Sequence, residues 1–136
     1  MDNLTHALFG AALAGVVVPE DALPARRRLF YAAGIVAANL PDLDLVYTAV
    51  TPAPLGYLLH HRGHTHTLVA LVAQAAVLAG LCHLSPAGRG VGGSVRGRLW
   101  GLLAAGLLSH VLLDAGNSYG VHPFFPFDAR HTLPRV

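Results

Sequence analysis

The stretch LWGLLAAGLLSHVLLD, residues 99–114, decides the fold, because a run without formal charge leads directly into a histidine and an aspartate. His110 and Asp114 are four residues apart, so on a helix their side chains share a face. A neutral imidazole and a carboxylate at this spacing can chelate one metal ion from two successive turns. Alternatively, Asp114 only orients His110 through a hydrogen bond. Both interpretations require an apolar helix with a polar end.

Three further runs without formal charge precede this stretch, at residues 3–19, 29–41 and 65–88. A helix that crosses a membrane needs about 20 residues, with a range of roughly 17–25. Runs 3–19 and 65–88 are long enough, whereas 29–41 and 99–113 are short. Residues 45–60 are apolar but contain Pro52 and Pro54, which would break a regular helix. We therefore expect one all-α domain over residues 1–136, a polytopic membrane bundle of about four transmembrane helices plus a short interfacial segment.

The composition also indicates a membrane protein, with the lipid bilayer as its first partner. Only 12% of the residues are charged and 54% are hydrophobic, whereas soluble domains carry about 25% charged residues. One cysteine, Cys82, excludes a disulfide scaffold. The basic residues are few and have no interleaved aromatic residues, so we expect no direct nucleic-acid binding. The chain opens Met1-Asp2-Asn3 without a basic segment, so the first apolar run is expected to be retained rather than cleaved as a signal.

The arginines divide the expected loops into two sides. Six of the nine fall within residues 19–28 and 85–98, and four spans would place both segments on the same side of the membrane. The positive-inside rule then puts these arginine loops in the cytoplasm. The protein is thus predicted to be a multi-pass protein of the cell membrane, with its motif face on the non-cytoplasmic side.

The same topology brings most of the other ionisable residues to that motif face. Ionisable side chains at the ends of membrane helices are costly unless they are paired or bound to a metal, which makes them functional candidates. The residues concerned are His6, Asp42, Asp44, the histidines of residues 60–66, His110 and Asp114.

The pair of acids in Pro41-Asp42-Leu43-Asp44 is the second candidate motif. In an extended segment the two carboxylates would point the same way, whereas on a helix they would diverge by about 200°. Two carboxylates in one place repel each other unless a cation is present. The alternative is that one of them caps the segment that follows.

The third motif, HHRGHTH at residues 60–66, contains four histidines and Arg62. Histidine-rich tracts bind metals readily, and Arg62 could hold a phosphate or carboxylate oxygen. The alternative is a solvated polar loop. The spacing leaves the ligands open, because 60 and 64 form a helical pair whereas 61 and 66 would need a turn. Thr65 or Thr67 could cap the helix that follows.

The remaining histidines carry weaker signals. A lone histidine at a helix end, such as His6, is more often interfacial than a ligand. Because His6 is expected on the same face as the other ionisable residues, it is still a candidate ligand. Cys82 and His83 end the third run on the opposite side, and we expect no functional role for them. His122 and His131 lie in a proline-containing tail and are not expected to be ligands.

Taken together, the motifs resemble the LexA-binding, inner-membrane-associated, metal-dependent hydrolase family. The resemblance covers nearly the whole chain and rests on Asn3-Leu4-Thr5-His6, Pro41-Asp42-Leu43-Asp44, His61-Arg62-Gly63-His64-Thr65-His66 and Ser109-His110-Val111-Leu112-Leu113-Asp114, followed by Tyr119-Gly120 and Pro123-Phe124. It implies metal or active-site roles for His6, Asp42, Asp44, His61, His66, His110 and Asp114. It also implies a soluble regulatory partner.

The pattern is more remotely similar to zinc-dependent phospholipase C and P1-type nucleases, which implies several metal ions acting on phosphoesters. Two departures from the family pattern are visible. Thr67 stands where the family usually has serine, and the chain stops soon after Pro126-Phe127, where many members continue into further membrane helices.

These observations predict a membrane-bound, metal-dependent hydrolase that acts on a phosphoester or lipid-linked substrate with a metal-activated water. Arg62 would hold the substrate anion, and Asp44 would serve as both ligand and catalytic base. Seven candidate ligands exceed the four that a tetrahedral ion uses, so one or two ions are expected. Zn²⁺ is favoured, with Mn²⁺ or Fe²⁺ as alternatives. The competing hypothesis is a non-enzymatic metal-binding membrane protein with a sensing or regulatory role.

Overall fold

A computed structural model describes residues 2–46, 64–116, 121 and 123–128. These residues form four α-helices, which confirms the all-α prediction for the part described. The helices are α1 (Asn3–Val17), α2 (Pro24–Asn39), α5 (Leu68–Leu84) and α6 (Gly93–Ala115), and two 3₁₀ helices, η1 (Leu40–Leu45) and η2 (His64–His66), accompany them.

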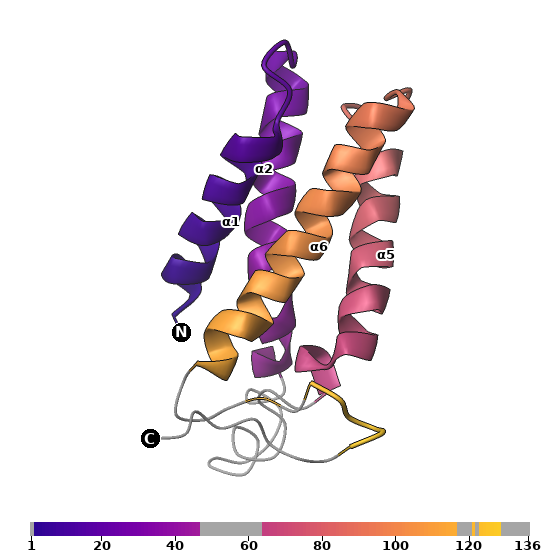
Figure 1. Cartoon of the computed structure of the whole chain (residues 1–136). Helices are drawn as coiled ribbons and strands as arrows, with labels where there is room; N and C mark the ends of the chain where they lie inside the picture. Colours follow the sequence, from indigo (N-terminus) through magenta and orange to yellow (C-terminus); the bar gives the residue numbers. More distant parts are fainter. Residues whose placement is uncertain (1, 47–63, 117–120, 122, 129–136) are drawn as a thin grey trace.

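The four helices alternate in direction, so each end of the bundle collects particular termini (Figure 1). We call the motif end the one where α1 and α5 begin and where α2 and α6 end, together with η1 and η2. The loop end carries the connections at residues 18–23 and 85–92. This arrangement brings parts of the chain that are far apart in sequence together at the motif end.

Local signals explain where the helices begin. The Asp2 side chain caps α1 by accepting a hydrogen bond from the Thr5 amide at 2.9 Å. Pro24 occupies the first turn of α2, where its missing N–H does no harm. The Thr67 hydroxyl caps α5 by accepting from the Ala70 amide at 3.1 Å, which confirms one of the two caps expected there.

Two helices begin earlier than their charge-free runs. α2 begins at Pro24 rather than at residue 29, and α6 begins at Gly93 rather than at residue 99. Most of the loop-end arginines therefore lie in the first turns of helices, and the expectation that they fall in loops was wrong. Arginine is a good helix former, and its long stem lets the guanidinium stay hydrated at a helix end.

Glycines allow α1, α2 and α6 to pack closely. A Cβ atom on Gly10 of α1 would overlap the carbonyl oxygen of Gly34 in α2. On α6, a Cβ atom on Gly106 would lie 3.0 Å from the Cβ of Ala37. Small residues at such crossings let helix backbones approach each other in membrane bundles. The close approach fixes the relative positions of three helix ends at the motif end.

Helix lengths test the membrane prediction only in part. Within the described residues, α6 is the helix that is long and apolar enough to cross a membrane, while α1 and α5 are apolar but shorter. α2 carries three arginines in its first two turns. One candidate span is thus seen, and the crossing of all four helices stays a prediction. The expected interfacial segment at residues 45–60 lies almost entirely outside the described residues.

Candidate metal centre

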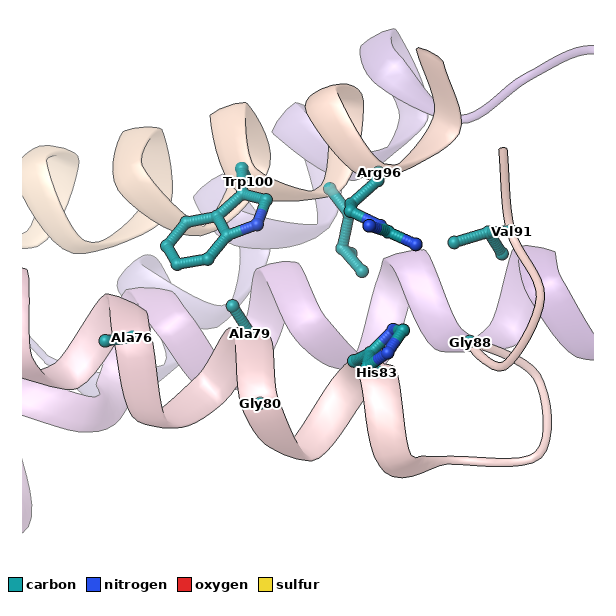
Figure 2. A pocket seen from close by; sticks show the side chains of 9 residues that line it. Ala76, Ala79, Gly80, His83, Gly88, Val91, Arg96 and Trp100 are labelled. Carbon is teal, nitrogen blue, oxygen red and sulfur yellow. The ribbon is translucent and has the colours of Figure 1, made fainter. Parts of the chain in front are cut away.

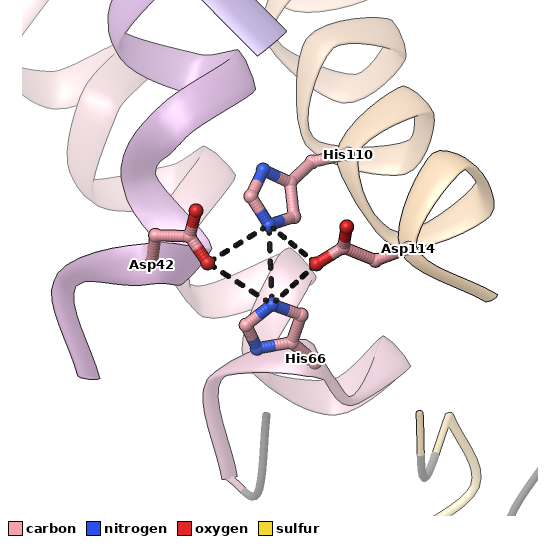
Figure 3. A group of neighbouring side chains, drawn as sticks. All are labelled: Asp42, His66, His110 and Asp114. Atoms are coloured by element: carbon pink, nitrogen blue, oxygen red, sulfur yellow. Dashed lines mark hydrogen bonds and ion pairs between the residues drawn. The ribbon is translucent and has the colours of Figure 1, made fainter. Parts of the chain in front are cut away.

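Four buried side chains converge at the motif end (Figure 3). Asp42 comes from η1, His66 from η2, and His110 and Asp114 from the last turns of α6. One ligand atom from each of the four lies within 4.8 Å of the ligand atoms of the others. A set of two imidazole nitrogens and two carboxylate oxygens at such distances is typical of a metal site.

The distances define one common point between these atoms. The Nε2 atoms of His66 and His110 lie 3.1 Å apart. The Asp42 Oδ1 lies 3.4 Å from the Nε2 of His110 and 3.6 Å from that of His66. From the other side, the Asp114 Oδ2 lies 3.5 Å and 3.6 Å from the same two nitrogens. Each imidazole therefore faces both carboxylates with the same nitrogen.

A backbone carbonyl of α2 orients His110. The Nδ1 of His110 lies 2.6 Å from the Ala38 carbonyl oxygen, and because a carbonyl only accepts, Nδ1 carries the proton that is donated. In the neutral ring, this leaves the Nε2 lone pair directed at the shared point. A hydrogen bond from the distal ring nitrogen is the usual support of a metal-binding histidine.

A threonine and an aspartate orient His66 in the same way. The Thr65 hydroxyl donates to the Asp44 Oδ2 at 2.9 Å and lies 3.0 Å from the Nδ1 of His66. Since the hydroxyl proton goes to Asp44, the Thr65 oxygen accepts the proton of Nδ1. Asp44 itself lies 3.6 Å from this nitrogen. The two acids of η1 thus serve opposite nitrogens of one ring, Asp42 at Nε2 and Asp44 at Nδ1.

The electrostatics of the centre favour a positive charge at the shared point. Burial alone lowers the pKa of His66, but hydrogen bonds with Asp114, Asp42 and Asp44 outweigh it and raise that pKa to about 10. Burial alone raises the pKa of Asp42, but hydrogen bonds from the two histidines hold it well below its usual range. A divalent cation at this point would be stabilised by the same two carboxylates, so these residues fit a metal ion.

His6 lies beside this group without a hydrogen bond of its own. Its side chain is fully buried, and its ring stacks on that of His110 with 3.9 Å between ring centroids. Neither ring nitrogen has a hydrogen-bond partner among the described residues, and Nε2 lies 3.4 Å from the Asp114 Oδ1. Asp114 therefore turns one oxygen toward His6 and the other toward His66 and His110.

The structure brings six of the seven predicted metal residues together: His6, Asp42, Asp44, His66, His110 and Asp114. The predicted residues His61 and Arg62 lie outside the described residues, as do His60, His122 and His131. His64 is exposed, with its ring edge against Phe125. His83 lies at the loop end, away from the centre.

Sequence reasoning missed two supporting groups, the Thr65 hydroxyl and the Ala38 carbonyl. Thr65 was considered only as a possible cap, although its position beside His66 in a histidine-rich motif was a usable signal. The Ala38 carbonyl had no signal, because every residue carries a carbonyl and only the packing of α6 against α2 selects this one.

The family model described as YdjM inner membrane protein matches residues 1–136. The chain belongs to this family. Among curated proteins, it is 29% identical over 133 residues to the uncharacterized protein YfhP of Bacillus subtilis (strain 168). That match covers 96% of this chain but 38% of YfhP, so the chain spans well under half the length of this relative. No solved structure matches the chain. A YdjM-family chain is an inner membrane protein, and here it carries a buried group that could hold a metal.

Proposed function

We propose that this YdjM-family chain is a membrane-bound, metal-dependent hydrolase. The observation that carries the proposal is the buried convergence of Asp42, His66, His110 and Asp114, with both imidazoles turned to one point by hydrogen bonds at their far nitrogens. Mixed imidazole and carboxylate ligation suits Zn²⁺ best, with Mn²⁺ or Fe²⁺ as alternatives.

A bound ion would supply Lewis acidity, polarising a phosphoryl or acyl oxygen and lowering the pKa of water. The chain's own residues would hold that ion in a fixed geometry. The Ala38 carbonyl fixes one ring, and the Thr65 hydroxyl, itself held by Asp44, fixes the other. These contacts favour Asp44 as a positioning residue that acts through His66, while its predicted role as a base remains a prediction. Arg62 is proposed to hold the substrate anion.

A second ion is part of the proposal, placed between His6 and the Asp114 Oδ1. A buried imidazole without a hydrogen bond is rare, because both of its nitrogens lose their water on burial. His6 and Asp114 would hold such an ion, which would satisfy the buried imidazole of His6. Metal content distinguishes one ion per chain from two.

We propose further that all four helices sit in the membrane together. Large apolar side chains are exposed on each of the four helices, and a lipid bilayer would remove them from water. Examples are Leu8 and Val16 of α1, Val36 of α2, Val72, Val77 and Leu81 of α5, and Leu108 and Leu112 of α6. The arginine-rich loop end would face the cytoplasm by the positive-inside rule, and the metal centre would then lie at the opposite surface.

The substrate is proposed to be a lipid or lipid-linked phosphoester. An apolar groove of about 510 Å³ lies between α1, α2 and η1 at the motif end, and Ala7 and Leu43 are among its lining residues. These two residues directly follow His6 and Asp42 in the chain. An acyl chain in this groove would bring its polar end next to the metal centre.

The test starts with the metal content of the full chain, purified in detergent and measured by mass spectrometry. The variant H110A/D114A is expected to lose nearly all bound metal. The matched variant H83A/D21A, a histidine and an aspartate at the loop end, is expected to keep it. Unchanged metal in H110A/D114A would overturn the proposal.

The second part of the test is turnover of a phosphodiester lipid in mixed micelles. We expect hydrolysis by the wild-type chain, its loss after chelation, and its return when Zn²⁺ is added. A specific observation favours the competing function of a non-enzymatic metal site: His66, His110 and Asp114 are 0% exposed, and closed four-ligand sites are usually structural. Tightly held metal without turnover would establish that function instead.

A further inference from the structure

A second groove opens between α5 and α6 at the loop end of the bundle, opposite the metal centre (Figure 2). Its volume is about 410 Å³. It is independent of the proposed hydrolase site, because none of its lining residues belongs to the metal centre. The lining residues are Ala76, Ala79, Gly80, His83, Gly88, Val91, Arg96, Leu99 and Trp100.

The groove changes from apolar to polar along the helix axis. Ala76, Gly80 and His83 follow each other at helical spacing on α5, so they share one face. On α6, Arg96 and Trp100 are one turn apart, and Figure 2 shows Arg96 near His83 and Trp100 nearer Ala76 and Ala79. At 1.5 Å per residue, the apolar stretch from Ala76 to His83 is roughly 10 Å long, the length of several methylene groups.

Arg96 provides an exposed positive charge at the polar end of the groove. The two other arginines of this segment form hydrogen bonds with backbone carbonyls: Arg89 donates to the Leu84 carbonyl at 2.9 Å, and Arg98 donates to the Val17 carbonyl at 3.3 Å. Among the described residues, no hydrogen bond or ion pair engages the Arg96 side chain. No lining residue is acidic. The groove therefore combines an apolar trough with an exposed guanidinium and no acidic lining residue.

We propose that this groove binds an anionic phospholipid of the membrane. The phosphate would lie between Arg96 and His83, and an acyl chain would lie along Ala76, Gly80 and Trp100. Basic pockets between membrane helices near the cytoplasmic surface recognise anionic head groups. Tryptophan is enriched at the level of the head groups, and Trp100, the one tryptophan of the chain, lies two turns into α6.

The first experiment blocks the trough and measures the phospholipid that stays bound. The full chain is reconstituted in bilayers of phosphatidylglycerol and phosphatidylcholine, extracted, and its retained lipid is counted by native mass spectrometry. G80L would fill the groove, and G101L is its control on α6, since an added Cβ at either position meets no atom within 4 Å. We expect G80L to lose most retained phosphatidylglycerol and G101L to keep it. Equal retention by both variants would overturn the proposal.

The second experiment tests recognition of the charge. R96Q is compared with R28Q, which removes an arginine at the same end of the bundle but outside the groove. We expect R96Q to weaken the preference for phosphatidylglycerol over phosphatidylcholine by about fivefold, as one lost contact to an anionic head group implies, and R28Q to leave it unchanged. Equal retention of both lipids by the wild-type chain, or displacement of the lipid by soluble glycerol phosphate, would each overturn the proposal. Circular dichroism of every variant checks that its helices are intact.

Discussion

Two helix pairs in this bundle are built from the same small residues and pack in opposite ways. At the crossing of α1 and α2, a Cβ on Gly10 would overlap the backbone of Gly34. Between α5 and α6, a Cβ on Gly80 would meet no atom within 4 Å, and a groove remains. The difference lies in the partner side chains, because α2 presents a glycine to α1, whereas α6 presents Arg96 and Trp100 to the groove. Small residues permit close packing but do not enforce it.

This difference matters for the metal centre. The close packing of α6 on α2 brings the Ala38 carbonyl within 2.6 Å of the His110 ring. By contrast, α5 meets the centre through polar contacts at its start, where Gln74 donates to the Thr65 carbonyl at 2.9 Å and Thr67 donates to the His64 carbonyl at 3.1 Å. The half of the centre on α6 thus depends on how closely the backbones of α6 and α2 pack. The half next to α5 depends on hydrogen bonds made by side chains.

The variant G10A is expected to cause the largest loss of stability. Its added methyl group would press on the backbone of α2, which cannot move aside as a flexible side chain can. Overpacking of this kind destabilises by about 3 kcal/mol. Thermal unfolding in detergent, followed by circular dichroism, measures the loss. A melting temperature equal to that of the wild-type chain would show that the crossing is looser than described.

The variant G106V tests whether helix packing reaches the metal centre. A Cβ at this position would lie 3.0 Å from the Cβ of Ala37 and 3.4 Å from the Ala38 nitrogen, so the larger valine should push α6 away from α2. We expect the hydrogen bond between His110 and Ala38 to lengthen and metal affinity to fall about tenfold, as for other losses of a supporting contact. Competition with a chelator measures this affinity. G101V, on an open face of α6, should leave it unchanged.

The variant T67A tests the half of the centre that depends on hydrogen bonds. It removes the cap of α5 and the bond to the His64 carbonyl, and loss of such a cap costs about 1 kcal/mol. T67S keeps the hydroxyl and should unfold like the wild-type chain in the same thermal measurement. Equal losses in T67A and T67S would show that the methyl group of Thr67, rather than its hydroxyl, stabilises the start of α5.

The variant G80A is expected to change stability least, and to raise it rather than lower it. Alanine is a better helix former than glycine by about 0.8 kcal/mol, and its methyl group would enter the open groove without a clash. The melting temperature should therefore rise slightly, whereas G10A should lower it strongly. A fall in G80A would show that α5 and α6 close on each other in solution.

Most of the fold could be predicted from charge alone, although not the ends of the helices. The runs at residues 3–19, 29–41, 65–88 and 99–113 each correspond to one helix of the described chain. A charge-free run marks apolar surroundings rather than helical backbone, so α2 and α6 extend past it through arginines, most of which are exposed. The proline of α2 and the cap of α5 were better signals of helix starts.

The candidate site could be predicted as a set of residues but not as a geometry. The alternation of four helices was enough to bring His6, Asp42, His66, His110 and Asp114 to one end. The sequence left open whether Asp42 and Asp44 point the same way, because that depends on the backbone between them. That backbone proved to be a 3₁₀ helix. Its tighter winding places the two carboxylates at opposite nitrogens of His66.

The order in which the ligands occur along the chain has a consequence for synthesis. Asp42, His66, His110 and Asp114 come from segments that leave the ribosome one after another, and α6 supplies two of the four. The centre therefore cannot form in a nascent chain before α6 has been made and has packed against α2. Until then the aspartate and histidines of the earlier segments lack the ligands that α6 supplies. A metal ion would therefore bind at the end of folding and would stabilise the contact between early and late segments of the chain.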